Sequence, residues 1–152
     1  MPQVLKWIDT PPVWLAGALL LAWVQARYLS LGLVFGDWAG AVGGVLVALG
    51  LLMICAALWQ MLRLRTTPVP HRVPAVLVTT GVFALSRNPI YLGDALILTG
   101  LILRWDAVVS LALVPVFVRL IGVRFVAIEE RRCRAAFGAA YDAYETRTRR
   151  WI

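Results

Sequence analysis

A stretch of nine residues, 86–94, concentrates polar side chains at the boundary between a polar loop and an apolar segment. It reads S-R-N-P-I-Y-L-G-D and brings together a guanidinium, a carboxamide, a phenol and a carboxylate. Pro89 is typical of the first turn of a helix, so the stretch predicts the point at which a helix enters apolar surroundings. Polar side chains are costly there and indicate a functional site.

A second group of charged side chains follows the last long apolar run of the chain. Arg119 and Glu130 are eleven residues apart, so a continuous α-helix would place both on nearly the same face after about three turns. The two charges could then bracket an elongated polar ligand. Structural ion pairs or solvated charges are the alternative for Arg124, Glu129 and Glu130. Arg119 lies deeper in the apolar run, so we expect it to have a defined partner.

Three other features are weaker indications of chemistry. Asp94 lies one turn into the predicted helix, where pairing with Arg27 or Arg119 is an alternative to a role in binding. His71, the only histidine, lies between prolines, which favours a solvated loop side chain over a general base. The two cysteines lack the spacing of a disulfide or zinc site, and nothing resembles a metal cluster, so no metal site is predicted. Nothing resembles a nucleotide-binding loop either.

The composition is that of a membrane protein. The 152 residues are 61% hydrophobic and have a mean hydropathy of +0.80, whereas a soluble domain is roughly half apolar. The net charge of +7 comes from residues that flank the apolar runs, as expected for positive charges on the cytoplasmic side of a membrane. A basic protein can also bind nucleic acid, but this distribution argues against a nucleic-acid partner.

Four apolar runs are candidate membrane spans: 13–29, 38–62, 89–103 and 107–118. The second has 25 residues without a charge and is the strongest candidate, since a helix needs about 20 apolar residues to cross a bilayer. The apolar segment 75–85 is too short to cross, and we interpret it as re-entrant or interfacial.

The predicted fold is an all-α polytopic membrane bundle in a single domain, 1–152. About four transmembrane helices are accompanied by the re-entrant segment and by C-terminal cytoplasmic helices, one of which ends at Gly138 and is followed by a second short helix. Residues 1–62 form two spans, and residues 63–152 form the half that carries the chemistry. The second span contains four glycines that predict close packing within the chain: Gly40, Gly43, Gly44 and Gly50. Gly40 and Gly44 form a GxxxG motif.

Basic residues in the 63–88 loop and in the C-terminal segment predict that both termini are cytoplasmic. We therefore expect an integral membrane protein. The sequence does not indicate an oligomeric state.

Two blocks of the sequence resemble one known family. Residues 77–93, L-V-T-T-G-V-F-A-L-S-R-N-P-I-Y-L-G, resemble the signature of the isoprenylcysteine carboxyl methyltransferase family in its short bacterial form. Residues 129–151 begin with paired glutamates, continue with F-G-x-x-Y-x-x-Y and end with basic residues, and they resemble the C-terminal block of that family. The first two spans match only as generic membrane helices. Because the resemblance is to the bacterial form, it implies a bacterial inner membrane.

The resemblance implies that S-adenosylmethionine is the methyl donor and S-adenosylhomocysteine the product. The acceptor would be a carboxylate, thiol or amine on a lipophilic or small molecule that is reached from the bilayer. Because the sulfonium methyl group is already electrophilic, the protein would mainly align the nucleophile and exclude water.

The resemblance also implies a set of site residues. The cofactor-binding residues would be Val78, Gly81, Asn88, Pro89, Tyr91, Leu92 and Glu130. Asn88 and Tyr91 would hold the methionine or adenosine part, and Glu130 the ribose hydroxyls. Arg87, Arg124 and Glu129 would be catalytic, with Arg87 organising the site and the other two lying toward the acceptor. The chain departs from many relatives in lacking a proline before the glutamate pair, and Asn88 stands where eukaryotic members have histidine.

Two alternatives remain open at the level of sequence. The C-terminal module of membrane sterol reductases is similar, which would make the chain an NADPH-dependent reductase. That function needs a dedicated cationic pocket for the 2′-phosphate, and the chain is short for a sterol site. A non-catalytic membrane protein of the same fold is the other alternative, and it would bind neither cofactor.

Overall fold

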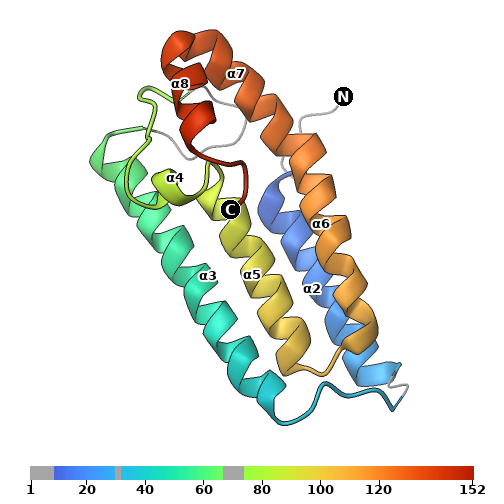
Figure 1. Ribbon diagram of the computed structural model, residues 1–152. Helices are drawn as coiled ribbons and strands as arrows, with labels where there is room; N and C mark the ends of the chain where they lie inside the picture. The colour runs from blue at the N-terminus through green and yellow to red at the C-terminus, as the bar shows by residue number, and fades with distance from the viewer. Residues whose placement is uncertain (1–8, 30–31, 67–73) are drawn as a thin grey trace.

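The structure is a computed structural model of the 152-residue chain and describes residues 9–29, 32–66 and 74–152. These residues are all helical or irregular, with no strand among them. Helix α2 (Pro11–Tyr28), α3 (Trp38–Arg63) and α5 (Pro89–Arg104) run side by side with a long helical segment that begins at Val108 (Figure 1). The prediction of an all-α bundle is confirmed.

The long helical segment changes its geometry along its length. It starts as a 3₁₀ turn, η1 (Val108–Ala112), and continues as α6 (Leu113–Ile121), a π-helical segment η2 (Gly122–Val126) and α7 (Ala127–Phe137). Gly138, at φ +50°, ends α7 and precedes α8 (Ala139–Arg147). The predicted helix end at Gly138 and the short helix after it are therefore confirmed.

Within the part of the chain that the structure describes, two helices are long and apolar enough to cross a membrane: Trp38–Arg63 and Val108–Phe137. Helices also occupy the predicted first and third spans, but α2 and α5 have only 18 and 16 residues. The count of four spans stays a prediction. Residues 75–81 are non-helical and lead into the short α4 (Val82–Leu85), and the re-entrant interpretation of this segment also stays a prediction. His71 lies outside the described residues.

The closest packing in the bundle joins α3 to α5 through glycine backbones. A Cβ atom on Gly43 would lie 2.5 Å from the carbonyl oxygen of Gly100, and a Cβ atom on Gly50 would lie 2.6 Å from that of Gly93. The two glycines of α3 are seven residues apart, and so are the two glycines of α5. Seven residues make about two turns, so each helix presents both of its glycines on one face. Close packing within the chain is thus confirmed.

The GxxxG motif is not the contact, because a Cβ atom on Gly40 or Gly44 would meet nothing within 4 Å. On its other side α5 packs against α2 and α6, with a buried apolar core formed by Ala22, Leu98, Ile102, Phe117, Ile121 and Phe125. The beginning of α2, the end of α3, the beginning of α5 and the α7–α8 pair lie at one end of the bundle (Figure 1). Both polar blocks of the sequence are therefore brought to the same end.

The glycine contact predicts that the same substitution, glycine to alanine, has different effects at two positions of α3. We expect Gly50→Ala to destabilise the fold by about 1–3 kcal/mol, because the added methyl group must displace the backbone of α5. Gly44→Ala should be neutral or stabilising by about 0.5–1 kcal/mol, because alanine is the better helix former and the site is open. Thermal unfolding in one detergent measures both variants, and equal melting temperatures would contradict the packing described here.

Candidate functional site

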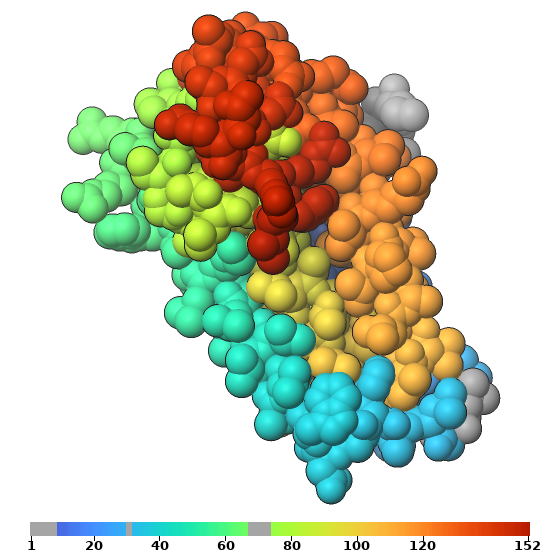
Figure 2. All heavy atoms as spheres, viewed as in Figure 1, coloured from blue at the N-terminus to red at the C-terminus, as the bar shows by residue number. Residues whose placement is uncertain are grey.

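A cavity of about 680 Å³ lies at the polar end of the bundle, between α3, α5, α7, α8 and the segment before α4. Its lining is mostly apolar and includes Ile54, Leu58, Met61, Val78, Phe83 and Ile90. In the space-filling view the C-terminal segment lies over the beginning of α5 and against the α4 region (Figure 2). The volume and the apolar walls with a few polar groups are typical of a small-molecule site.

The S-R-N motif before α5 is held by the C-terminal segment of the chain. The backbone N–H of Arg87 donates to the carbonyl oxygen of Arg149 at 3.0 Å. Ser86 Oγ and Asn88 Nδ2 both donate to the carbonyl oxygen of Arg150, each at 3.1 Å. Ser86 Oγ also accepts from the N–H of Asn88 at 3.1 Å. The orientation of the motif therefore depends on residues more than sixty positions later.

A buried ion pair connects the same segments through their side chains. Glu130, whose side chain is 10% exposed, lies 3.2 Å from Nη2 of Arg87 through its Oε1. Nε of Arg150 donates to that oxygen at 3.0 Å, and Nη2 of Arg150 donates to Oε2. Glu130 lines the cavity as predicted, but its carboxylate already holds two arginines. The role that these contacts support is to join α7, the motif and the C-terminal segment.

Helix α8 is fastened to this cluster by a second glutamate. Nη1 of Arg87 lies 2.6 Å from Glu145, which also pairs with Arg134. The hydrogen bond from Arg87 lowers the pKa of the Glu145 carboxyl, because the charged form is favoured by a cationic donor. The hydroxyl of Tyr144 donates to the carbonyl oxygen of Phe83 at 2.5 Å, which ties α8 to α4.

The two tyrosines of α8 supply neutral phenols to the cavity wall. Burial raises the pKa of Tyr141 to about 12 and also raises the pKa of Tyr144. Burial disfavours the phenolate, so both hydroxyl groups stay protonated at neutral pH. Both side chains line the cavity and are only 3% exposed.

A hydrogen bond joins α5 to α7 in the cavity, and one turn further along α5 lies a carboxylate without a partner. Tyr91 Oη donates to Oε1 of Glu129 at 2.8 Å. Asp94, one turn further along α5, lines the cavity and is 7% exposed. Among the described residues it has no hydrogen-bond or ion-pair partner, so the predicted alternatives of Arg27 and Arg119 are not realised.

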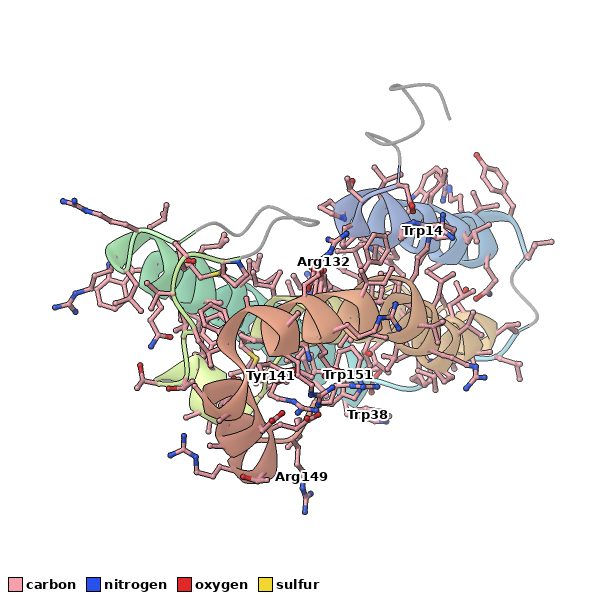
Figure 3. All side chains as sticks on the ribbon, turned by 90° about the horizontal axis from the view of Figure 1, so that it is seen from above. Trp14, Trp38, Arg132, Tyr141, Arg149 and Trp151 are labelled. Carbon is pink, nitrogen blue, oxygen red and sulfur yellow. The ribbon has the colours of Figure 1, made fainter. Side chains whose placement is uncertain are left out.

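The guanidinium groups of the cavity also keep N–H groups without hydrogen-bond partners. Arg132 of α7 lines the cavity, and its buried Nη1 has no hydrogen-bond partner. Figure 3 shows Arg132 on the side of α7 that faces α2 and α3. Nε of Arg87 is also buried without a hydrogen-bond partner, so the lining offers one unpartnered carboxylate and unpartnered N–H groups on two arginines. Asp94 and Arg132 are not among the site residues predicted from sequence, although each lies three residues after a predicted one, Tyr91 or Glu129, and therefore on the same helix face.

Seven of the ten site residues predicted from sequence line this one cavity: Val78, Arg87, Asn88, Pro89, Tyr91, Glu129 and Glu130. The other three lie elsewhere. Gly81 packs against the side chain of Gln60, to which a Cβ atom would come within 2.3 Å, and Leu92 continues α5 without lining the cavity.

Arg124 does not reach the cavity. Its Nε donates to Asp9 at 2.7 Å, its guanidinium lies 5.6 Å from the ring centroid of Trp14, and its side chain is 51% exposed. The prediction that Arg119 and Glu130 lie on nearly the same helix face is wrong, since Arg119 is exposed and Glu130 is buried. The π-helical segment Gly122–Val126 lies between them. Its wider turn changes the phase of the helix, so an eleven-residue spacing no longer returns to one face.

Comparison with known proteins gives one match. The family model described as phospholipid methyltransferase matches residues 38–140, from the beginning of α3 to the beginning of α8. No curated protein and no solved structure matches the chain. The matched region contains the S-R-N-P-x-Y motif and the glutamate pair, and it ends before the C-terminal segment that holds the motif.

The tail contacts predict different effects for two adjacent arginines. Arg150→Ala removes the bidentate partner of Glu130, and we expect a loss of about 1 kcal/mol, since Arg150 is partly exposed. Arg149 uses only its carbonyl oxygen, and Figure 3 shows it at the outer edge of the bundle. Arg149→Ala should therefore change the free energy of unfolding by less than about 0.5 kcal/mol. Equal losses in thermal unfolding would contradict a specific role for the Arg150 side chain.

The lowered pKa of Glu145 predicts a pH-dependent contribution to stability. A carboxyl group with a depressed pKa stabilises the fold above its unfolded pKa of about 4.3, and this contribution is lost as the pH falls further. The melting temperature of the wild type should therefore exceed that of Glu145→Gln at pH 7. The difference should shrink as the pH is lowered below about 4. A difference that is constant from pH 7 to pH 3 would show that the ionised carboxylate is not responsible.

Proposed function

The chain belongs to the phospholipid methyltransferase family, and on this premise we propose that it is a membrane-embedded enzyme that uses S-adenosylmethionine to methylate a lipophilic acceptor. The family implies methyltransferase activity. The observation that carries the proposal is the convergence of both polar blocks on one mostly apolar cavity at one end of the bundle. Neither block alone forms this site.

The polar groups of the cavity fit the proposed cofactor. S-adenosylmethionine carries a sulfonium cation, an ammonium, a carboxylate and ribose hydroxyl groups. The unpartnered Nη1 of Arg132 matches a carboxylate, because buried polar groups need a hydrogen-bond partner. Glu129 remains a potential acceptor beside the Tyr91 hydroxyl. Asn88 donates its Nδ2 to the C-terminal segment and leaves its Oδ1 as an acceptor.

When bound, the cofactor supplies an electrophilic methyl group, so the chain's own work is to bind, orient and exclude water. Tyr91 and Glu129 are fixed by their mutual hydrogen bond, and Asn88 by its bond to Arg150. Helix α8 covers the outer end of the cavity through the Tyr144–Phe83 hydrogen bond. These contacts keep the donors and acceptors in place before a ligand binds, which reduces the reorganisation needed at the reaction step.

The apolar walls support a lipophilic acceptor. Ile54, Leu58 and Ile90 line the cavity on the α3 and α5 sides. The outer surface of α3 is apolar as well, with Leu49, Leu52 and Trp59 exposed. Burying a hydrocarbon chain against such walls contributes about 0.8 kcal/mol per methylene group. A carboxylate, a thiol or an amine can each be the group methylated.

Cofactor binding tests the proposal. We expect S-adenosylhomocysteine to raise the melting temperature of the purified protein saturably and NADPH to have no effect, because a ligand stabilises the state that binds it. Tyr91→Phe and Glu129→Gln should each weaken this binding about tenfold or more, since hydrogen bonds to charged groups contribute about 1.5–3 kcal/mol. Arg104→Ala, at the far end of α5, is the control and should bind normally.

Other results of this titration would change the assignment. A shift with NADPH alone would indicate a reductase, and no shift with either compound would indicate a non-catalytic protein of the same fold. Methyl transfer is then measured with labelled S-adenosylmethionine over fractionated membrane lipids. A protein that binds the cofactor but labels no lipid fraction would contradict the lipophilic acceptor.

A further inference from the structure

Asp94 is the buried charge of the cavity that the fold itself does not explain. It lies on α5 one turn below Tyr91, is 7% exposed and lines the cavity. No other described residue forms a hydrogen bond or an ion pair with it. The nearby tyrosine hydroxyl is not available, because Tyr91 donates its proton to Glu129.

A purely structural role does not account for this arrangement. Removing a carboxylate from water costs several kcal/mol unless donors or cations replace the solvent. The other buried acids of the cavity have such partners: Glu130 holds Arg87 and Arg150, and Glu129 accepts from Tyr91. Asp94 therefore lowers the stability of the empty protein, and its partner is expected to be a ligand.

The charges that line the cavity indicate which kind of ligand this is. The charge of Arg87 is balanced by Glu130 and Glu145 through its two terminal nitrogens, and only its buried Nε has neither an ion-pair nor a hydrogen-bond partner. Two carboxylates, Asp94 and Glu129, then face one available guanidinium, Arg132, which lies close enough to Glu129 to interact electrostatically. The inner cavity thus has an excess of negative charge. It would repel an anionic group and attract a cationic one.

We propose that Asp94 is a binding site for a positively charged, hydrogen-bond-donating group, an ammonium, of a ligand in this cavity. The inference rests on the proposed function, which supplies two possible sources of the group: the amino acid part of the cofactor and the methyl acceptor. The same geometry disfavours an acceptor that presents a carboxylate at this position.

The experiment compares ligands of opposite charge on matched variants. The full-length protein in a nonionic detergent is titrated with S-adenosylhomocysteine, with dodecylamine and with dodecanoate, and binding is measured by the shift in melting temperature. Dodecylamine and dodecanoate share a chain length and differ in the charge of the head group. The variants are Asp94→Asn, which keeps the shape and removes the charge, and Asp94→Leu. Asp37→Asn, at the opposite end of the bundle, is the control.

We expect the wild type to prefer dodecylamine to dodecanoate, and both Asp94 variants to lose at least tenfold in affinity for an ammonium ligand. A loss confined to S-adenosylhomocysteine would identify the cofactor as the source of the ammonium, and a loss confined to dodecylamine would identify the acceptor. Without ligand, both variants should melt at the wild-type temperature or above, because no protein contact is lost.

Three results would overturn the inference. They are unchanged affinities for both ammonium ligands in Asp94→Asn, an equal or stronger wild-type response to dodecanoate, and a clear drop in melting temperature of both ligand-free variants. If the wild type failed to bind S-adenosylhomocysteine, the proposed function would fail. The comparison of dodecylamine with dodecanoate would still test Asp94.

Discussion

The site depends on one buried ion pair, in which Glu130 of α7 holds Arg87 and Arg150. A carboxylate that is 10% exposed is tolerated only when it is paired, so the three segments that carry these side chains must meet. Their meeting also aligns the backbone, because the carbonyl oxygens of Arg149 and Arg150 then accept from the S-R-N motif. The polar wall of the cavity therefore combines the beginning of α5 with the first turn of α7, and the C-terminal segment holds the two together. None of these segments could hold the motif in this orientation by itself.

A second constraint determines where the cavity begins. One face of α3 carries Gly43 and Gly50, which bring the backbone of α5 into contact, and then Ile54, Leu58 and Met61, which line the cavity. The spacing of these residues keeps them on the same side of the helix over five turns. Close backbone packing in one half and larger side chains in the other convert a single helix face from a contact into a wall. The glycines thus support the site without touching it.

Much of this site could be predicted from sequence because its main components are local. Four of its residues lie within five positions at the beginning of one helix: Arg87, Asn88, Pro89 and Tyr91. The glutamate pair lies in the first turn of another helix. What could not be predicted depends on long-range geometry. The family resemblance implies that Arg124 belongs to the site, but Arg124 lies in the π-helical segment and pairs with Asp9 instead. Apolar spacing gives no indication of a π turn, since each flanking helix keeps its own regular pattern. The tail contacts were also missed, because they use carbonyl oxygens that every residue possesses.

The distribution of partners among the charges separates those that build the site from those available to a ligand. Arg87, Glu130, Glu145 and Arg150 pair with one another in one cluster of ion pairs, and this cluster holds α8 in place. Asp94, the Nη1 of Arg132 and the Nε of Arg87 remain unpartnered. Such groups are costly in an apolar cavity and would be lost or paired if packing alone decided the fold. Their cost is the expected consequence of a cavity prepared for a polar ligand, because a donor and an acceptor that were already satisfied would have nothing to offer it.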